Sequence, residues 1–152
     1  MAYEEELLQM KRSFGCSHEP IHGSNGLANS TNISTWLSKV VKLKETEQYL
    51  IVNDQGVFIG VLDIKKQLNQ YTSKEGGHIS YSIIKEHQNK GYATQALKLA
   101  CDLGYQLGLK RILLTCKDDN KASQRVILKN EPQKAYTIRL NRQMIWHYWF
   151  YR

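Results

Sequence analysis

The stretch Ile79–Leu114 constrains the fold of this chain more than any other part of the sequence. It begins as an apolar run of strand character, passes through a polar turn to Gly91, and continues with small and apolar residues at every third or fourth position. That period is one face of an α-helix. Gly108 is suited to end the helix, and the apolar run Arg111–Cys116 indicates a buried strand. The order strand, loop, helix, strand predicts a βαβ crossover.

The loop ahead of this helix is suited to bind an anion. N–H groups in the first turn of a helix lack internal partners and carry partial positive charge, which favours phosphate oxygens. Gly91 has no Cβ, so a ligand can approach its main chain, and Lys90 adds a positive charge. Two common nucleotide motifs are excluded, because neither Gly-x-Gly-x-x-Gly nor Gly-x-x-x-x-Gly-Lys-Ser/Thr occurs in the chain.

The other segments predict helices that flank a largely antiparallel sheet. Apolar spacing indicates helices at Glu4–Phe14 and after Asn32, where the side chain can cap the helix. Runs rich in β-branched and aromatic residues indicate the strands Gln48–Asn53, Val57–Ile64, Lys134–Leu140 and Ile145–Tyr151. A chain of 152 residues without internal repeats fits one domain, which we expect to span residues 1–152.

Composition argues against several classes of protein. No apolar run approaches the roughly 20 residues that cross a bilayer, and the acidic segment Met1–Glu6 is unlike a signal peptide, so we expect a cytoplasmic protein with no membrane partner. The net charge of +7 is uneven: residues 1–75 carry 8 Lys and Arg against 9 Asp and Glu, and residues 76–152 carry 13 against 5. A polyanionic ligand of the loop would favour this asymmetry. Nucleic acid would favour it too, but no nucleic-acid-binding motif is present, so no specific nucleic acid is expected.

Two motifs in the basic half resemble a known family. The pattern Gln88-x-x-Gly91-x-Ala93 resembles the acyl-coenzyme A signature of the GNAT N-acetyltransferase superfamily. The segment Asn120–Asn130 resembles the Asn-x-x-Ser-x-x-Val-Ile-x-Lys-Asn sequence that follows the fifth strand in many GNAT enzymes. Three shorter segments are similar to a bacterial subfamily of predicted acetyltransferases: His22–Ser24, Gly76–Ile79 and His147–Trp149. The whole resemblance covers about residues 18–152.

The resemblance implies the fold and the reaction. The fold is of the α/β (α+β) class, with a mixed, mostly antiparallel sheet, flanking helices and a central βαβ crossover. Family members begin with a strand that we expect to be absent here, because the chain starts almost at its first helix. The implied activity is transfer of an acetyl group from acetyl-coenzyme A, without a metal, to a primary amine of a small molecule or peptide.

Residues that match the family motifs carry the implied cofactor site. Main-chain groups near the end of the strand would contact the pantetheine arm, the loop would hold the pyrophosphate, and two residues of the later motif would reach the arm. Asn120 is equally suited to cap the next helix, and its two roles are compatible. In order, the residues are Ser82, Ile83, Ile84, then Gln88, Asn89, Lys90, Gly91, Tyr92, Ala93, Thr94, then Asn120 and Ser123.

The expected catalytic residues are His78, Ser123 and Tyr81. His78 stands where several GNAT members place a general-base glutamate, and imidazole accepts a proton near neutral pH. Its alternative role is to cap the turn at the two glycines before it. Ser123 resembles a serine proposed to protonate the thiolate in ribosomal-protein N-terminal acetyltransferases, and Tyr81 and Tyr148 are further candidate acids. The helix position where many members carry an acidic tyrosine holds Ile127 here.

Several alternatives stay open at this point. The loop Gly15–Asn29, with His18, Glu19 and His22, is a metal site, an acceptor-binding loop or a plain connection, and Asp63 and Glu75 are carboxylates that could act through water. A non-catalytic, regulatory acyl-coenzyme A-binding module is the alternative function, favoured by the missing tyrosine. The sequence does not identify the amine acceptor, and a homodimer is left open.

Overall fold

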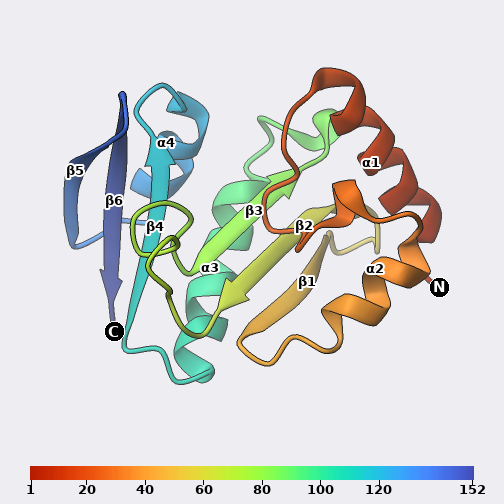
Figure 1. Ribbon diagram of the computed structural model, residues 1–152, viewed down its shortest axis with the longest axis horizontal. Helices are drawn as coiled ribbons and strands as arrows, with labels where there is room; N and C mark the ends of the chain where they lie inside the picture. Colours follow the sequence, from red (N-terminus) through yellow and green to blue (C-terminus); the bar gives the residue numbers. More distant parts are fainter.

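The computed structural model describes residues 1–152 and contains two three-stranded sheets side by side (Figure 1). The strands are β1 (Thr46–Val52), β2 (Phe58–Lys65), β3 (Ile79–Ile83), β4 (Arg111–Lys117), β5 (Lys134–Leu140) and β6 (Gln143–Tyr151). The helices are α1 (Glu4–Ser17), α2 (Ile33–Val40), α3 (Tyr92–Gln106) and α4 (Lys121–Leu128), with short 3₁₀ turns η1 (Leu27–Asn29) and η2 (Lys85–His87). The sheets have the orders β1-β2-β3 and β4-β6-β5, and every hydrogen-bonded strand pair is antiparallel. This arrangement confirms the predicted fold class.

The predicted elements are all present, with shifted ends. α1 continues past Phe14 because Ser17 hydrogen-bonds back into its last turn, and it ends where His18 adopts a left-handed conformation. β1 starts at Thr46, before the expected Gln48, because its pairing with β2 extends that far. The polar turn after β3 forms η2, which apolar spacing does not reveal in so short a segment.

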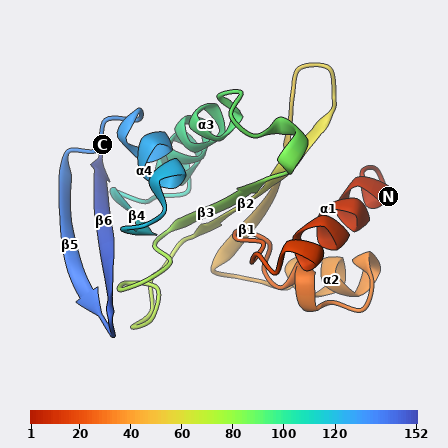
Figure 2. The ribbon, with the colours of Figure 1, turned by 90° about the horizontal axis from the view of Figure 1, so that it is seen from above.

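Helices cover both faces of the first sheet (Figure 2). α1 and α2 lie on one face, and α3 lies on the other. β2 is buried along most of its length between them. Its Val61 belongs to the apolar cluster with α1 and α2, while Leu62 and Ile64 belong to the cluster with α3. β2 therefore separates two cores, and its burial on both faces explains its continuous apolar sequence.

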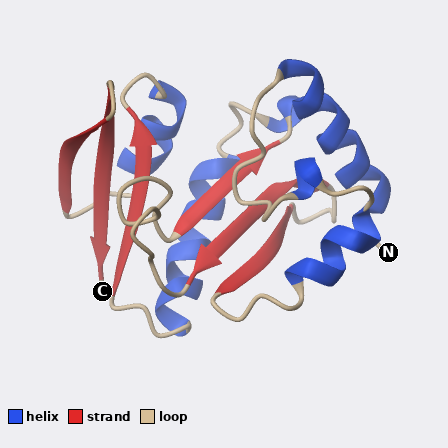
Figure 3. Cartoon of the chain, in the orientation of Figure 1, coloured by secondary structure: helices blue, strands red, loops and turns tan.

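β3, α3 and β4 form the predicted βαβ crossover, which carries the chain from one sheet to the other (Figure 3). One apolar cluster contains buried side chains from all three elements and from the second sheet and α4: Ile79, Leu97, Ile112, Ile127 and Phe150 are among them. The hydrophobic core is thus continuous across the two sheets, although their strands are not.

The main chains of the two sheets are hydrogen-bonded to each other only where β3 begins. His78 N–H donates to the Leu113 carbonyl over 2.7 Å, and Leu113 N–H donates to His78 Nδ1 over 2.9 Å. Gly77 permits this approach, because an added Cβ would lie 2.4 Å from the Leu113 oxygen. Beyond this junction β3 and β4 diverge toward their carboxyl ends (Figure 1). We call the diverging ends the fork.

Gly77→Ala tests how closely the junction is packed. The added methyl group would meet the Leu113 oxygen and would also strain a main chain with φ of 66°. We expect the free energy of unfolding to fall by about 3 kcal/mol or more, measured by urea titration with tryptophan fluorescence.

Gly108→Ala is the matched control. Gly108 also has a left-handed conformation, with φ of 98°, but an added Cβ there would meet nothing within 4 Å. Only the backbone strain of about 1–2 kcal/mol is then expected. Equal losses in the two variants would show that the junction has room for a methyl group.

Candidate functional site

The loop between η2 and α3 presents a series of main-chain donors. Six consecutive N–H groups have no acceptor within the protein: those of Asn89, Lys90, Gly91, Tyr92, Ala93 and Thr94. Asn89 and Gly91 have left-handed conformations, with φ of 58° and 85°, which turn successive N–H groups toward one side. An added Cβ at Gly91 would meet no protein atom within 4 Å, so the loop faces open space. We call these six groups the amide cradle.

The cradle fits an anion for two independent reasons. Its donors are unsatisfied by the protein, and they lie at the N-terminus of the 15-residue helix α3, where the helix dipole adds partial positive charge. Gln88 is outside the cradle: its N–H donates to the Lys85 carbonyl over 3.3 Å. Its side chain donates to the Ile83 carbonyl over 2.9 Å and so ties the loop to the end of β3.

The open edge of β3 lies in the fork. Antiparallel ladders alternate, and the pairing with β2 directs the main-chain groups of Ser82 toward β2 and those of Tyr81 and Ile83 away from it. Ile84 N–H donates to the Ile59 carbonyl over 3.0 Å. Of the three residues predicted to contact the pantetheine arm, Ile83 therefore has a free N–H at the open edge, and Tyr81 joins it there. The binding roles themselves stay predictions.

Two predicted catalytic residues meet across the fork. The hydroxyl groups of Tyr81, on β3, and Ser123, on α4, lie 3.2 Å apart. Burial raises the pKa of Tyr81 to about 12, and the Ser123 hydrogen bond acts against that rise. Burial, followed by the Asp118 charge, raises the pKa of the neighbouring Cys116 thiol to about 11. These groups are therefore protonated at neutral pH.

Asn120 caps α4, as one of its two predicted roles required. Its Oδ1 accepts a hydrogen bond from Ser123 N–H over 3.1 Å. The cap orders the first turn of α4 and so positions the Ser123 hydroxyl beside Tyr81. Its predicted contact with a cofactor stays a prediction.

His78 lies on the other side of the fork from Tyr81 and Ser123. Its ring packs edge-on against Trp149, whose side chain points to the face of the second sheet opposite Tyr148 and Phe150. The residue is 7% exposed. Its Nδ1 accepts the hydrogen bond from Leu113 N–H that a main-chain carbonyl would accept in a continuous sheet. Burial, followed by the Arg111 and Lys65 charges, lowers the pKa of His78 to about 4. Its side chain therefore bonds the neighbouring strand rather than the glycine turn, and its catalytic role stays a prediction.

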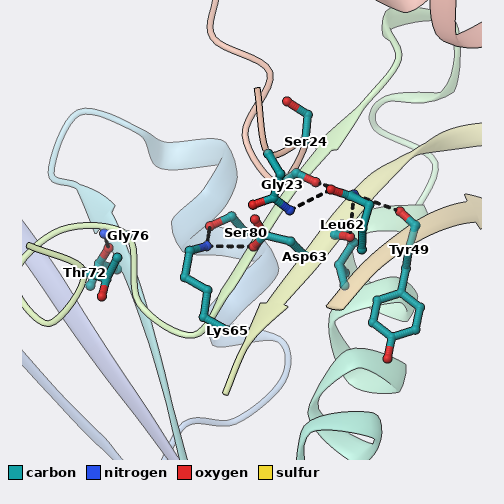
Figure 4. Close-up of polar contacts among 12 residues, drawn as sticks. Gly23, Ser24, Tyr49, Leu62, Asp63, Lys65, Thr72, Gly76 and Ser80 are labelled. Atoms are coloured by element: carbon teal, nitrogen blue, oxygen red, sulfur yellow. Dashed lines mark hydrogen bonds and ion pairs between the residues drawn. The ribbon is translucent and has the colours of Figure 1, made fainter. Parts of the chain in front are cut away.

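Charged side chains gather on the face of the fork away from α3. Buried Asp63 pairs with Lys65 over 2.8 Å, beside Ser80 and the main chain of Gly23 (Figure 4). Burial raises the pKa of Asp63, and the Lys65 ammonium opposes the rise. His22 is an exposed residue whose ring is partly buried, and that partial burial, followed by the Lys117 charge, lowers its pKa. The loop Gly15–Asn29 is thus docked against the fork through this cluster.

A cavity of about 670 Å³ opens beside the carboxyl end of β4. Its lining contains three carboxylates, two cations and several polar groups: Glu75, Lys117, Asp118, Asp119, Leu140, Asn141, Arg142, Gln143, Met144 and Ile145. Nowhere do three His, Cys, Asp or Glu side chains lie close enough to hold a metal ion. None of the helices has the length and apolarity to cross a membrane.

The sequence analysis did not predict a role for two residues on the side of the fork away from α3. Lys117 follows an apolar strand and precedes two aspartates, and that clustering of charge at a strand end was a usable signal. Gln48 hydrogen-bonds both the Gly23 and the Leu62 carbonyls, over 2.7 and 2.9 Å, and so fastens the loop to β2. A polar residue inside an apolar strand was the only sign of that role.

Comparisons with known proteins agree with the resemblance. Residues 18–131 match the family described as "Acetyltransferase (GNAT) domain". The uncharacterised N-acetyltransferases YnaD and YoaA of Bacillus subtilis (strain 168) are 31% identical over 81 residues and 39% identical over 62 residues. These matches cover 53% and 40% of this chain, and they span only 45% and 35% of the relatives' own lengths.

Solved structures share the fold at low sequence identity. Spermidine N-acetyltransferase SpeG from Vibrio cholerae, in complex with CoA and spermine, has a TM-score of 0.57 and 18% identity over 78% of this chain and 73% of that one. A dodecameric structure of the same enzyme has a TM-score of 0.66 and 15% identity, covering 97% and 89%. At this identity the likeness concerns the fold alone.

The environment of His78 predicts a pH dependence of stability. The unfolded side chain gains a proton below a pKa of 6.5, whereas the folded one resists protonation until about 4. The free energy of unfolding should therefore decrease as pH falls from 6.5 to about 4, by about 3 kcal/mol at most.

His78→Asn should flatten this part of the pH profile, because an amide oxygen can accept from Leu113 N–H but does not titrate. The free energy of unfolding of this variant, measured by denaturant titration at several pH values, checks this expectation. His18→Asn, at an exposed position of the Gly15–Asn29 loop, is the control and should keep the wild-type slope. An unchanged slope in His78→Asn would show that another group titrates.

Proposed function

Because this chain belongs to the GNAT acetyltransferase domain family, we propose that it is an acetyl-coenzyme A-dependent N-acetyltransferase that acts on a primary amine. The amide cradle is the observation that carries the proposal. Six free N–H groups at a helix N-terminus match a diphosphate, which offers several acceptor oxygens and a charge that a helix dipole stabilises. Acetyl-coenzyme A contains such a diphosphate and supplies an activated acetyl group.

The proposed path of acetyl-coenzyme A runs from the amide cradle to the fork. The Asn89–Thr94 donors hold the diphosphate, and the open edge of β3 offers the main chains of Tyr81 and Ile83 to the pantetheine amides. An extended arm bound in this way would bring its thioester beside the Tyr81 and Ser123 hydroxyls. Orientation of the thioester against the incoming amine is the larger part of the expected catalysis.

Tyr81 is the proposed acid that protonates the departing thiolate. Its hydroxyl lies in the fork, it keeps its proton at neutral pH because burial raises its pKa to about 12, and Ser123 orients it from 3.2 Å. Ser123 could relay a proton to Tyr81 after each turnover. His78, predicted from the sequence as the base, lies on the opposite side of the fork with its Nδ1 engaged by Leu113.

The acceptor is proposed to enter from the face that carries the 670 Å³ cavity. Glu75, Asp118 and Asp119 would attract a cationic amine such as spermine, which the Vibrio cholerae enzyme binds, whereas Lys117 and Arg142 would suit an acceptor that also carries a carboxylate. A thiol-release screen with acetyl-coenzyme A and a panel of polyamines, amino acids, peptides and aminoglycosides separates these classes.

A non-catalytic acyl-coenzyme A-binding module is the competing function. It is favoured by Ile127, which occupies the position of the family's acidic tyrosine and is fully buried in the core. Such a module would bind acetyl-coenzyme A by calorimetry yet release no thiol with any amine of the panel.

Gly91→Glu tests the cradle. A carboxylate at this position would lie in the open space that the diphosphate is proposed to fill, and it would repel the phosphates. We expect the dissociation constant for acetyl-coenzyme A, measured by isothermal titration calorimetry, to rise about 100-fold or more, equivalent to about 2.7 kcal/mol. Gly108→Glu is matched in charge, in left-handed conformation and in open surroundings, and should bind normally. Unchanged binding in Gly91→Glu would overturn the proposal.

Tyr81→Phe tests the acid. Removal of the hydroxyl should lower kcat about 100-fold, a typical size for acid catalysis, with the KM for acetyl-coenzyme A changed by less than about threefold. Ser123→Ala should lower kcat by a smaller factor, and Tyr151→Phe, at an exposed tyrosine, is the control. Loss of activity in Tyr148→Phe, with Tyr81→Phe fully active, would transfer the role to Tyr148.

A further inference from the structure

We propose that His22 is the base that takes the proton from the acceptor amine. This inference rests on the proposed function and concerns the acceptor side of the same site. It places the base on the N-terminal loop rather than on the strand β3, where the family resemblance placed it.

His22 is an exposed side chain on an immobilised main chain. Its neighbours Ile21, Gly23 and Ser24 are buried, and only His22 among the four is exposed. Trp36 Nε1 donates to the Ser24 carbonyl over 2.6 Å, and Ser24 Oγ donates to the Ile21 carbonyl over 2.8 Å. The main chain on both sides of His22 is therefore held in place, so the exposed side chain has a defined position.

Gly23 fixes where this loop meets the fork. A Cβ on Gly23 would lie 2.2 Å from the Ser80 carbonyl oxygen, so the loop main chain lies directly against β3 (Figure 4). Gln48 Nε2 holds the Gly23 carbonyl from the other side over 2.7 Å. The loop main chain is therefore held against β3 at Ser80, and His22 is the residue directly before this contact.

The charges that act on His22 come from three segments around the fork. They are Lys117 at the end of β4, Asp63 and Lys65 on β2, and Glu75 in the loop before β3. Lys117 and Glu75 also line the 670 Å³ cavity. Two of the charges that act on His22 therefore belong to the cavity proposed for the acceptor, and we place His22 beside that cavity.

The two histidines differ in what their ring nitrogens can do. A neutral imidazole has one nitrogen lone pair for a proton, and in His78 that lone pair accepts from Leu113 N–H. His22 is an exposed residue, and its ring nitrogens make no hydrogen bond to the protein. Partial burial and the Lys117 ammonium lower the pKa of His22, so the ring is mostly neutral at pH 7 and free to accept a proton.

The proton balance is complete with groups already described. An alkylammonium acceptor loses two protons in forming an amide. His22 takes the first and passes it to solvent, and the neutral amine then forms the C–N bond while the C–S bond breaks. Tyr81 gives its proton to the thiolate, and the second proton from nitrogen restores the Tyr81 hydroxyl through Ser123 or water.

The experiment compares pH profiles of kcat/KM for wild type, His22→Asn, His18→Asn and His78→Asn, measured by thiol release. The acceptor is whichever of spermidine, lysine methyl ester and a tripeptide with a free N-terminus turns over fastest. In His22→Asn we expect kcat/KM at pH 7 to fall about 100-fold, the deficit to shrink as pH approaches the pKa of the acceptor, and added imidazole to restore part of the rate. Acetyl-coenzyme A affinity should stay within twofold of wild type.

His18→Asn is matched in chemistry and lies on the same loop, and it should keep the wild-type profile. A wild-type profile in His22→Asn, or a lost acid limb in His78→Asn with His22→Asn unaffected, would overturn the assignment. Absence of thiol release by the wild type with all three amines, despite tight acetyl-coenzyme A binding, would instead overturn the proposed enzymatic function.

Discussion

The junction between His78 and Leu113 is the interaction on which the rest of the structure depends. Here an imidazole nitrogen accepts the hydrogen bond that a strand carbonyl would accept in a continuous sheet. Because the substitution happens at the start of β3, the two strands are held together at one end and are free to part at the other. Beyond this junction no ladder hydrogen bonds join the two sheets, and the apolar cluster beneath α3 holds them together.

This arrangement gives the fork two chemically different sides. Toward α3 and α4 lie hydroxyl and thiol groups whose burial keeps them protonated, including Tyr81 and Cys116. Away from α3 lie the Asp63–Lys65 pair and the imidazole of His22, whose partial burial favours the neutral form. In the proposed mechanism the proton donor and the proton acceptor thus lie on opposite sides of the fork, so each can keep its own protonation state.

The sequence predicted what depends on local periodicity and on short motifs. The spacing of Ala96, Leu97 and Ala100 was enough to place α3, and Gly91 marked the loop before it. What the sequence did not predict depends on pairing between distant segments. The direction of the Ser82 main chain follows from the register with β2, and the contact between Tyr81 and Ser123 follows from the packing of α4 against α3 and β4. No local pattern encodes either of them.

The amide cradle has a consequence for how freely this surface can vary. Main-chain N–H groups are the same in nearly every amino acid, so the side chains of Asn89, Lys90 and Thr94 can change while the donors remain, provided that the backbone keeps its path. Two kinds of substitution would weaken the proposed anion binding: proline, which lacks the N–H, and a side chain that fills the space at Gly91. Recognition of this kind is tolerant of sequence drift, which suits a fold that recurs in chains sharing fewer than one residue in five.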